Sequence, residues 1–266
     1  VCKAMKAGIP VVLHNIDDSQ RGKGNCRMAY IGQFFIETGQ TLAERMIADH
    51  GLKAGDHVFT PVEFPEAVYA VQRHEGVNNG ITAMGGTTEI LGTGTDHSEA
   101  LNIMVQYLLG HPETDAVIGL GSTPTSVAVR AVEEAGMDIP VGGYDITPEI
   151  LDNIANGSLT ATVDQQPYHQ GYMSVTMLAQ NLKYGLLPAD MNTGGSGLVD
   201  KSNVDPSLSD ETAPFAILLD VTASNASSSE PTAPGAISVP CTCPSTIACL
   251  SILLKLLYVA IFSPLP

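Results

Sequence analysis

Short apolar runs alternate with longer segments of helical periodicity through most of the chain. The apolar runs predict strands at residues 9–14, 28–31, 57–62, 88–91, 115–120, 139–144 and 159–164. The periodic segments predict helices at residues 38–50, 65–78, 97–109, 123–135, 148–156 and 168–184. Strands separated by helices of this length form βαβ units with right-handed crossovers. The pattern therefore predicts an α/β fold with parallel sheets.

Helix boundaries carry their own signals in the stretch that follows residues 139–144. Thr147 can cap a helix, Pro148 stands where a missing N–H costs nothing, and Glu149 suits the first turn. Gly157 then ends the helix. Asp96, which has a glutamate three residues later, has the spacing of a capping box.

Two polar side chains follow the carboxyl ends of predicted strands. Asp145 follows one strand and Gln165 follows the next. In a parallel sheet both would point into one crevice, where open α/β sheets bind ligands. A carboxylate and an amide suit a ligand with many hydroxyls. Asp145 could instead be a simple helix cap, and Asp164 or Gln166 replaces Gln165 if the register slips by one residue.

Composition narrows the classes of partner. The chain has 266 residues, 44% hydrophobic residues, a net charge of −16 and a pI near 4.6. This acidity argues against binding to nucleic acid or to anionic membranes. The seven histidines have no zinc-helix spacing, so we expect no metal site.

The cysteines are few and lie near the two ends. Cys2 and Cys26 precede a long stretch without cysteine, and Cys241, Cys243 and Cys249 lie in the last thirty residues. Because this spacing matches no disulfide framework and no CxxC pair, we interpret all five as incidental.

The segment VGGYDITPEILDNIANGSLTATVDQQPYHQGY resembles the ligand-binding edge of the periplasmic sugar-binding proteins of the ribose type. The likeness extends over residues 3–203. It implies a type I periplasmic binding protein, with two Rossmann-like lobes that close on a sugar. It also implies a monomer in the periplasm that carries a monosaccharide or polyol to an ABC permease, with no cofactor and no catalytic residue.

The resemblance implies where the lobes begin and end. Residues 1–37 would be a remnant of the N-terminal lobe, residues 38–184 the C-terminal sugar-binding lobe, and residues 185–204 the return crossing. Only two strands precede the second lobe, so we expect the first lobe to be incomplete. Because the chain begins with Val1, we expect it to be a piece of a longer protein.

From residue 205 the composition changes. Residues 205–266 are rich in Ser, Thr, Ala and Pro without a clear period, which predicts a disordered or unrelated tail. The apolar run at 247–262 is shorter than the roughly 20 residues of a spanning helix. We prefer a fused or spurious C-terminus, and membrane tethering is the alternative.

The resemblance also implies further ligand-binding residues. Arg73 stands three residues before Gly76, as an arginine does at the family's sugar site, and Asn15 follows a strand where the family has a polar residue. Phe34 and Phe35 replace a polar residue of the family and could stack on a sugar or belong to the core. A solvated helix arginine and a turn asparagine are the plainer interpretations.

A second departure concerns Gly121 and Ser122, which stand where the family commonly has Asn-Asp. Fewer polar contacts would fit a smaller, less hydroxylated or differently oriented ligand. The segment GLGSTP suggests a dinucleotide loop, but Pro124 replaces the third glycine. No GxSxG elbow surrounds Ser122, so we expect no enzyme. The alternative function is the ligand-sensing core of a LacI-type regulator, which shares the fold.

Overall fold

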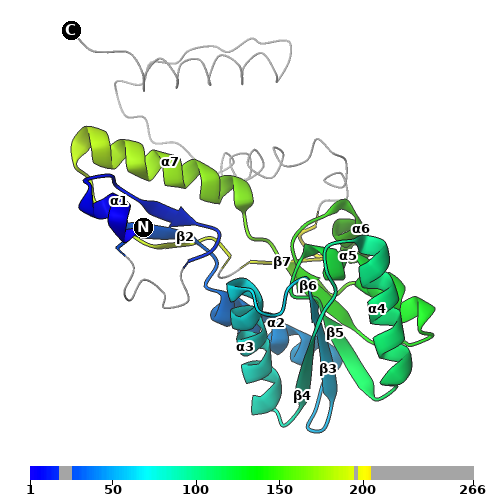
Figure 1. Cartoon of the computed structure of the whole chain (residues 1–266). Helices are drawn as coiled ribbons and strands as arrows, with labels where there is room; N and C mark the ends of the chain where they lie inside the picture. The colour runs from blue at the N-terminus through cyan, green and yellow to red at the C-terminus, as the bar shows by residue number, and fades with distance from the viewer. Residues whose placement is uncertain (18–25, 195–196, 205–266) are drawn as a thin grey trace, which may run out of the picture. The chain divides into compact units, whose positions relative to one another are not determined.

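The computed structural model describes residues 1–17, 26–194 and 197–204 (Figure 1). They all lie in the first of the two units into which the chain divides, residues 1–217. The predictions for residues 205–266 lie outside the described residues. Among the described helices, none has both the length and the hydropathy that crossing a bilayer requires.

The larger sheet has six strands in the order β4-β3-β5-β6-β7-β9. Their bounds are β3 (His57–Val62), β4 (Thr87–Gly92), β5 (Thr114–Ile118), β6 (Val141–Tyr144), β7 (Ala161–Val163) and β9 (Leu198–Asp200). The first five pair in parallel, and β9 pairs antiparallel with β7. The predicted parallel sheet is confirmed. The strand order reverses between β3 and β5, which makes this point the topological switch of the sheet.

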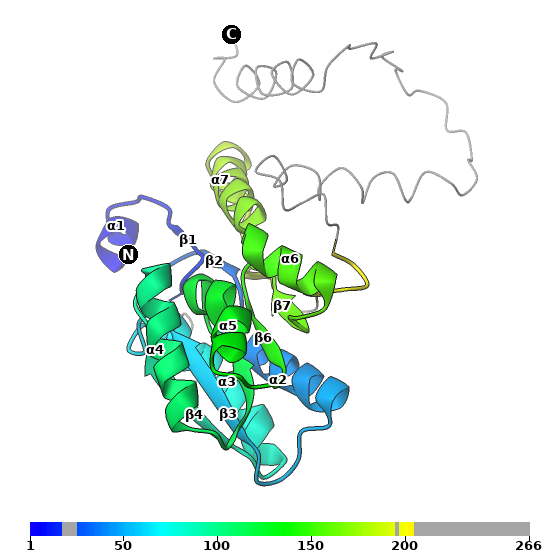
Figure 2. The same ribbon diagram turned by 90° about the vertical axis from the view of Figure 1, so that its right-hand side faces the viewer.

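Helices cover both faces of this sheet (Figures 1 and 2). On one face lie α2 (Phe35–His50) and α3 (Val68–Ala83), and on the other lie α4 (His97–Gly110), α5 (Ser122–Glu134) and α6 (Pro148–Asn156). Neighbouring residues of β3 enter different cores, because side chains alternate along a strand. Val58 packs under α2 and α3, whereas Phe59 packs under α4 and α5. Burial on both faces explains why the strands read as continuous apolar runs.

The helix signals in the sequence are confirmed. The Thr147 hydroxyl accepts from the Ile150 N–H, and Gly157 ends α6 in the left-handed conformation. Asp96 caps α4 through the N–H groups of residues 98 and 99. The boundaries differ by a few residues: α2 begins at Phe35 rather than at residue 38, and α3 spans Val68–Ala83 rather than 65–78.

Three glycines bring α2 and α3 into close contact. A Cβ at Gly76 would overlap the carbonyl of Ile36, and a Cβ at Gly80 would lie 2.8 Å from the Ala43 Cβ. A Cβ at Gly39 would lie 2.5 Å from the backbone oxygen of Arg73. The close contact between the two helices therefore explains why a glycine stands at position 76, three residues after Arg73.

A smaller parallel sheet has the order β1-β2-β8, with β1 (Val12–His14), β2 (Ala29–Gly32) and β8 (Met191–Asn192). Helix α7 (Pro167–Tyr184) packs on this sheet through Met173, Met177 and Leu178. We expected residues 38–184, which include α7, to form the C-terminal lobe. The contacts of α7 with the smaller sheet differ from that expectation. Residues 185–204 then supply one strand to each sheet, β8 to the smaller and β9 to the larger.

The interpretation of all five cysteines as incidental is wrong for one pair. A disulfide joins Cys2, in the short helix α1 (Cys2–Lys6), to Cys26, with a Cα–Cα distance of 4.7 Å. In a parallel pair the two strands start side by side, so the chain must return to the start of β1 before it enters β2. Tertiary pairing thus brings together residues that are 24 positions apart. The other cysteines lie outside the described residues.

Candidate functional site

A cavity of about 200 Å³ lies at the carboxyl ends of the strands of the larger sheet, beside the segment that follows β1. It is lined by Asn15, Ile16, Phe35, Glu63, Tyr69, Arg73, Gly121, Ser122, Asp145 and Gln165. The structure therefore brings together all the residues that the sequence singled out for ligand binding except Phe34, whose exposed fraction is 37%. The cavity includes the topological switch point between β3 and β5.

Asp145 is held in an unusual backbone conformation at the end of β6. Its φ is 77°, in the left-handed region that non-glycine residues rarely adopt. The backbone N–H of Asp145 donates to the Val163 carbonyl, and its own carbonyl accepts from the Thr162 hydroxyl. These two bonds to β7 hold the backbone of Asp145 in this conformation. Because Thr147 caps α6, the alternative role of Asp145 as the helix cap is excluded.

A chain of hydrogen bonds connects three of the cavity side chains. The Gln165 amide donates to Oδ1 of Asp145, and its oxygen accepts from Nδ2 of Asn15 at 3.4 Å. Gln165 thus links the segment after β1 to the larger sheet. Gln166 is the N-cap of α7, and neither it nor Asp164 lines the cavity, so the register with Gln165 holds.

The carboxylate of Asp145 is electrostatically costly. Burial raises the pKa of Asp145 above its ordinary value, and the Arg73 guanidinium and the Gln165 hydrogen bond oppose this rise. A partly desolvated carboxylate forms charge-assisted hydrogen bonds with hydroxyl donors that are stronger than bonds between neutral groups.

Arg73 is buried, with 2% of its surface exposed, so the interpretation as a solvated helix arginine is wrong. Its Nη1 donates to the Leu120 carbonyl at 2.7 Å, and its Nη2 donates to Oε1 of Gln33 at 3.0 Å. Gln33 follows β2, so this second bond is another link between the two sheets. Within the described residues, Nε of Arg73 and Nε2 of Gln33 have no hydrogen-bond partner. A buried donor without a partner costs about 1–3 kcal/mol.

Three aromatic rings surround the guanidinium of Arg73. Its carbon lies 4.1 Å from the ring centroid of Tyr144, 5.1 Å from that of Phe35 and 5.2 Å from that of Tyr69. Such cation–π contacts favour a desolvated cation. Phe35 is therefore part of the core around Arg73 and also part of the cavity wall.

Sequence reasoning missed Glu63 and Tyr69. Glu63 directly follows β3 and is 8% exposed. Its Oε1 accepts from the N–H of Thr123 at 3.0 Å, and its Oε2 accepts from the Tyr69 hydroxyl at 3.0 Å. A Cβ at Gly121 would overlap this carboxylate, so a larger residue there would displace the Glu63 side chain. The sequence signal that could have found Glu63 is the one that identified Asp145, namely a carboxylate immediately after a predicted strand.

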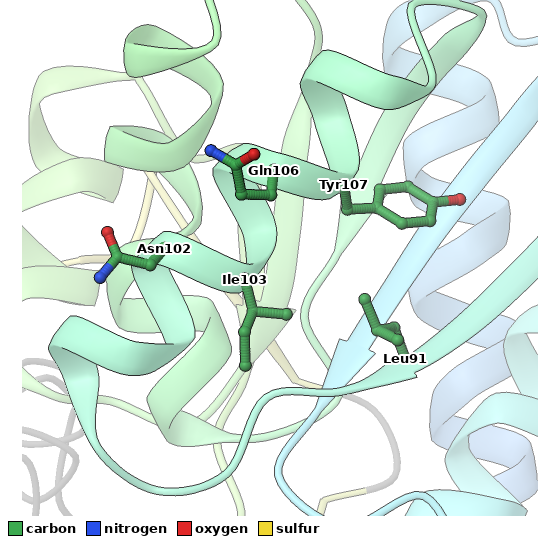
Figure 3. Close-up of a pocket in the computed structure, with 5 residues that line it drawn as sticks. All are labelled: Leu91, Asn102, Ile103, Gln106 and Tyr107. Carbon is green, nitrogen blue, oxygen red and sulfur yellow. The ribbon is translucent and has the colours of Figure 1, made fainter.

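A second hollow, of about 450 Å³, lies between β4 and the outer side of α4 (Figure 3). It is lined by Leu91, Asn102, Ile103, Gln106 and Tyr107. It has no charged side chain and shares no residue with the cavity around Asp145. Within the described residues, no group of three or more His, Cys, Asp or Glu side chains is placed to hold a metal ion.

Comparison with known proteins gives a consistent picture. The family described as periplasmic binding protein domain matches residues 1–186. The xylose/arabinose-binding protein XylF of Sulfolobus acidocaldarius is 27% identical over 224 residues, which cover 77% of this chain and 54% of that protein. The ribose import binding protein RbsB of Salmonella typhimurium is 34% identical over 89 residues, or 33% of this chain and 30% of that protein.

A solved structure has the same fold. The carbohydrate transporter of Acidothermus cellulolyticus, in complex with myo-inositol, superimposes with a TM-score of 0.66 at 29% identity, covering 80% of this chain and 72% of that chain. The chain spans about half the length of XylF and less than a third of RbsB. The family match over residues 1–186 agrees with the parallel sheets and with the cavity at their strand ends. The chain therefore belongs to the periplasmic binding protein domain family.

Proposed function

We propose that the chain is the ligand-binding part of a solute-binding protein of an ABC-type sugar importer. Its ligand is a monosaccharide or polyol, and it carries out no reaction. The observation that carries this proposal is the cavity in which Asp145, Gln165 and Arg73 meet at strand ends. The names of the relatives, which bind xylose, arabinose or ribose, and the myo-inositol complex support a polyhydroxylated ligand.

Binding would use both sides of the cavity. Asp145 accepts from ligand hydroxyls, Gln165 and Asn15 donate and accept, and Phe35 offers a ring face. The six-stranded sheet belongs to one lobe, and the three-stranded sheet with α7 belongs to the other. A ligand that contacts both lobes favours the closed state by its differential affinity for that state.

The proposed partners follow from the family. The protein delivers its ligand to an ABC permease as a monomer, in the periplasm or outside the cell, and binds no nucleic acid. The LacI-type regulator is less favoured, because the relatives are named for sugar binding or import.

Calorimetric titration of the chain with pentoses, hexoses and polyols tests the proposal. At least one compound should bind, and Asp145→Ala should weaken its binding about tenfold to hundredfold, since a hydrogen bond to a charged group contributes roughly 1.5–3 kcal/mol. Asp152→Ala, which removes an exposed carboxylate of α6, is the control and should bind as the wild type does. If no compound binds, or if the two variants bind equally well while folded, the proposal is wrong.

A further inference from the structure

Glu63 lies at the switch point of the larger sheet and is held from two sides. The N–H of Thr123, in the first turn of α5, binds Oε1, and the Tyr69 hydroxyl of α3 binds Oε2. A carboxylate has about four lone-pair sites, so these two bonds leave acceptor capacity. Because Glu63 lines the cavity, that capacity is available to a ligand.

The cavity wall has more negatively charged than positively charged side chains. It contains two carboxylates, Glu63 and Asp145, and one guanidinium, that of Arg73. Nη1 and Nη2 of Arg73 each donate one hydrogen bond to a protein oxygen, so part of its donor capacity is used within the protein. Burial and the Glu63 carboxylate raise the pKa of Tyr69, so its hydroxyl stays neutral. The wall therefore offers charged acceptors in excess of charged donors.

This imbalance discriminates between ligands. Hydroxyl groups can donate to both carboxylates, whereas an anionic ligand would bring a third negative charge into a partly desolvated site. Like charges repel more strongly there than in water. The glycine at position 121, whose Cβ would overlap Glu63, allows the carboxylate to stay at the wall.

We infer that Glu63 is a specificity-determining residue, an inference that rests on the proposed function. It acts as a second charged acceptor for the hydroxyls of an uncharged sugar or polyol, and it excludes sugar acids. Asp145 and Glu63 follow different strands, so they would bind hydroxyls on different parts of the ligand.

Glu63→Gln tests this inference, because it removes the charge and keeps the shape. The amide oxygen can still accept from Thr123, and the amide N–H can donate to Tyr69. Matched pairs are titrated calorimetrically: D-glucose with D-glucuronate, D-galactose with D-galacturonate, and D-xylose with D-xylonate. The wild type should bind an uncharged member and bind its acid at least about a hundredfold more weakly. Glu63→Gln should weaken sugar binding about tenfold and narrow the sugar-to-acid ratio by a similar factor.

Glu66→Gln is the matched control, since it removes the same charge from an exposed neighbouring position outside the cavity. It should leave the ratio unchanged. If the wild type binds sugars but Glu63→Gln retains both the affinity and the ratio, or if the wild type binds acids equally well, the inference about Glu63 is wrong and the sugar-binding proposal stands. If the wild type binds no compound, both are overturned.

Glu63→Asp keeps the inference testable if Glu63→Gln does not fold. This variant retains the charge but withdraws it by one methylene group. It should weaken sugar binding about tenfold while still rejecting acids. Sugar affinity equal to that of the wild type would contradict the role of Glu63 as an acceptor.

Discussion

Asp145 combines two unfavourable features in one residue. Its φ of 77° lies in a sparsely populated region, and its carboxylate is half-buried. The bonds from its backbone to Val163 and Thr162 hold it in place. Such strain at a cavity wall is typical of residues kept for binding rather than for stability.

The raised pKa of Asp145 predicts a pH dependence of stability. Because the folded-state pKa of Asp145 lies above its ordinary value of 3.8, the native state holds the proton more tightly than the unfolded state between these two values. The contribution of Asp145 to the free energy of unfolding should therefore fall as pH rises through this window. Without ligand, Asp145→Asn should be more stable than the wild type at pH 7, and the difference should shrink towards pH 4. Urea unfolding at several pH values measures this, and a constant difference would contradict it.

Arg73 shows why a buried arginine cannot be exchanged for lysine. Its fork reaches two acceptors, and its plane lies among three rings. Arg73→Lys should lower the free energy of unfolding by about 2–3 kcal/mol, because a buried ammonium cannot make both bonds. Arg130→Lys, at an exposed pair with Glu134, should change it by less than about 0.5 kcal/mol. Equal effects of the two substitutions in urea titrations would show that the contacts of Arg73 contribute little.

At the scale of elements, the α2–α3 pair positions part of the cavity. Phe35 begins α2, whereas Tyr69 and Arg73 lie one turn apart on α3. The glycine contact between the helices brings Phe35 to Arg73. The location of the site therefore depends on helix packing as well as on strand ends.

Two glycine substitutions separate helix packing from helix propensity. Gly76→Ala places a Cβ on the Ile36 carbonyl and should destabilise the protein by about 1–3 kcal/mol. Gly171 lies within α7, and a Cβ added there would meet nothing within 4 Å, so Gly171→Ala should be neutral or stabilising by up to about 1 kcal/mol. Thermal melts of both variants, with a fluorescent reporter of unfolding, provide the measurement. A Gly76→Ala variant as stable as Gly171→Ala would mean that the helices can separate without cost.

At the scale of the described fold, the two sheets are connected by several segments. Residues 185–204 contribute β8 to one sheet and β9 to the other, and Arg73 and Asn15 bond across. The disulfide adds a further constraint, because Cys2 and Cys26 enclose β1 and Asn15.

Reduction of this disulfide should lower stability. Opening a loop of this size restores unfolded-state entropy equivalent to roughly 3 kcal/mol. The urea midpoint of the wild type should fall when a reductant is added. A variant with Cys2→Ser and Cys26→Ser should start at the lower midpoint and should not respond to the reductant. A wild-type midpoint that is insensitive to reduction would contradict this prediction.

The amino-acid sequence alone determined the features that depend on local interactions. Helix caps such as Thr147 and Asp96, the parallel α/β class and the positions of Asp145 and Gln165 at strand ends all follow from neighbouring residues and from periodicity. Those signals require contacts over only a few positions, so one sequence is enough to read them.

Tertiary structure alone decided which distant elements become neighbours. Glu63 accepts from the N–H of Thr123 because β3 lies beside β5, although a helix, a strand and a second helix separate these strands in the chain. The Cys2–Cys26 disulfide depends on the parallel pairing of β1 with β2, and α7 packs on the smaller sheet through its methionines. Strand order and helix docking are determined by burial of the whole apolar surface, which no local pattern encodes.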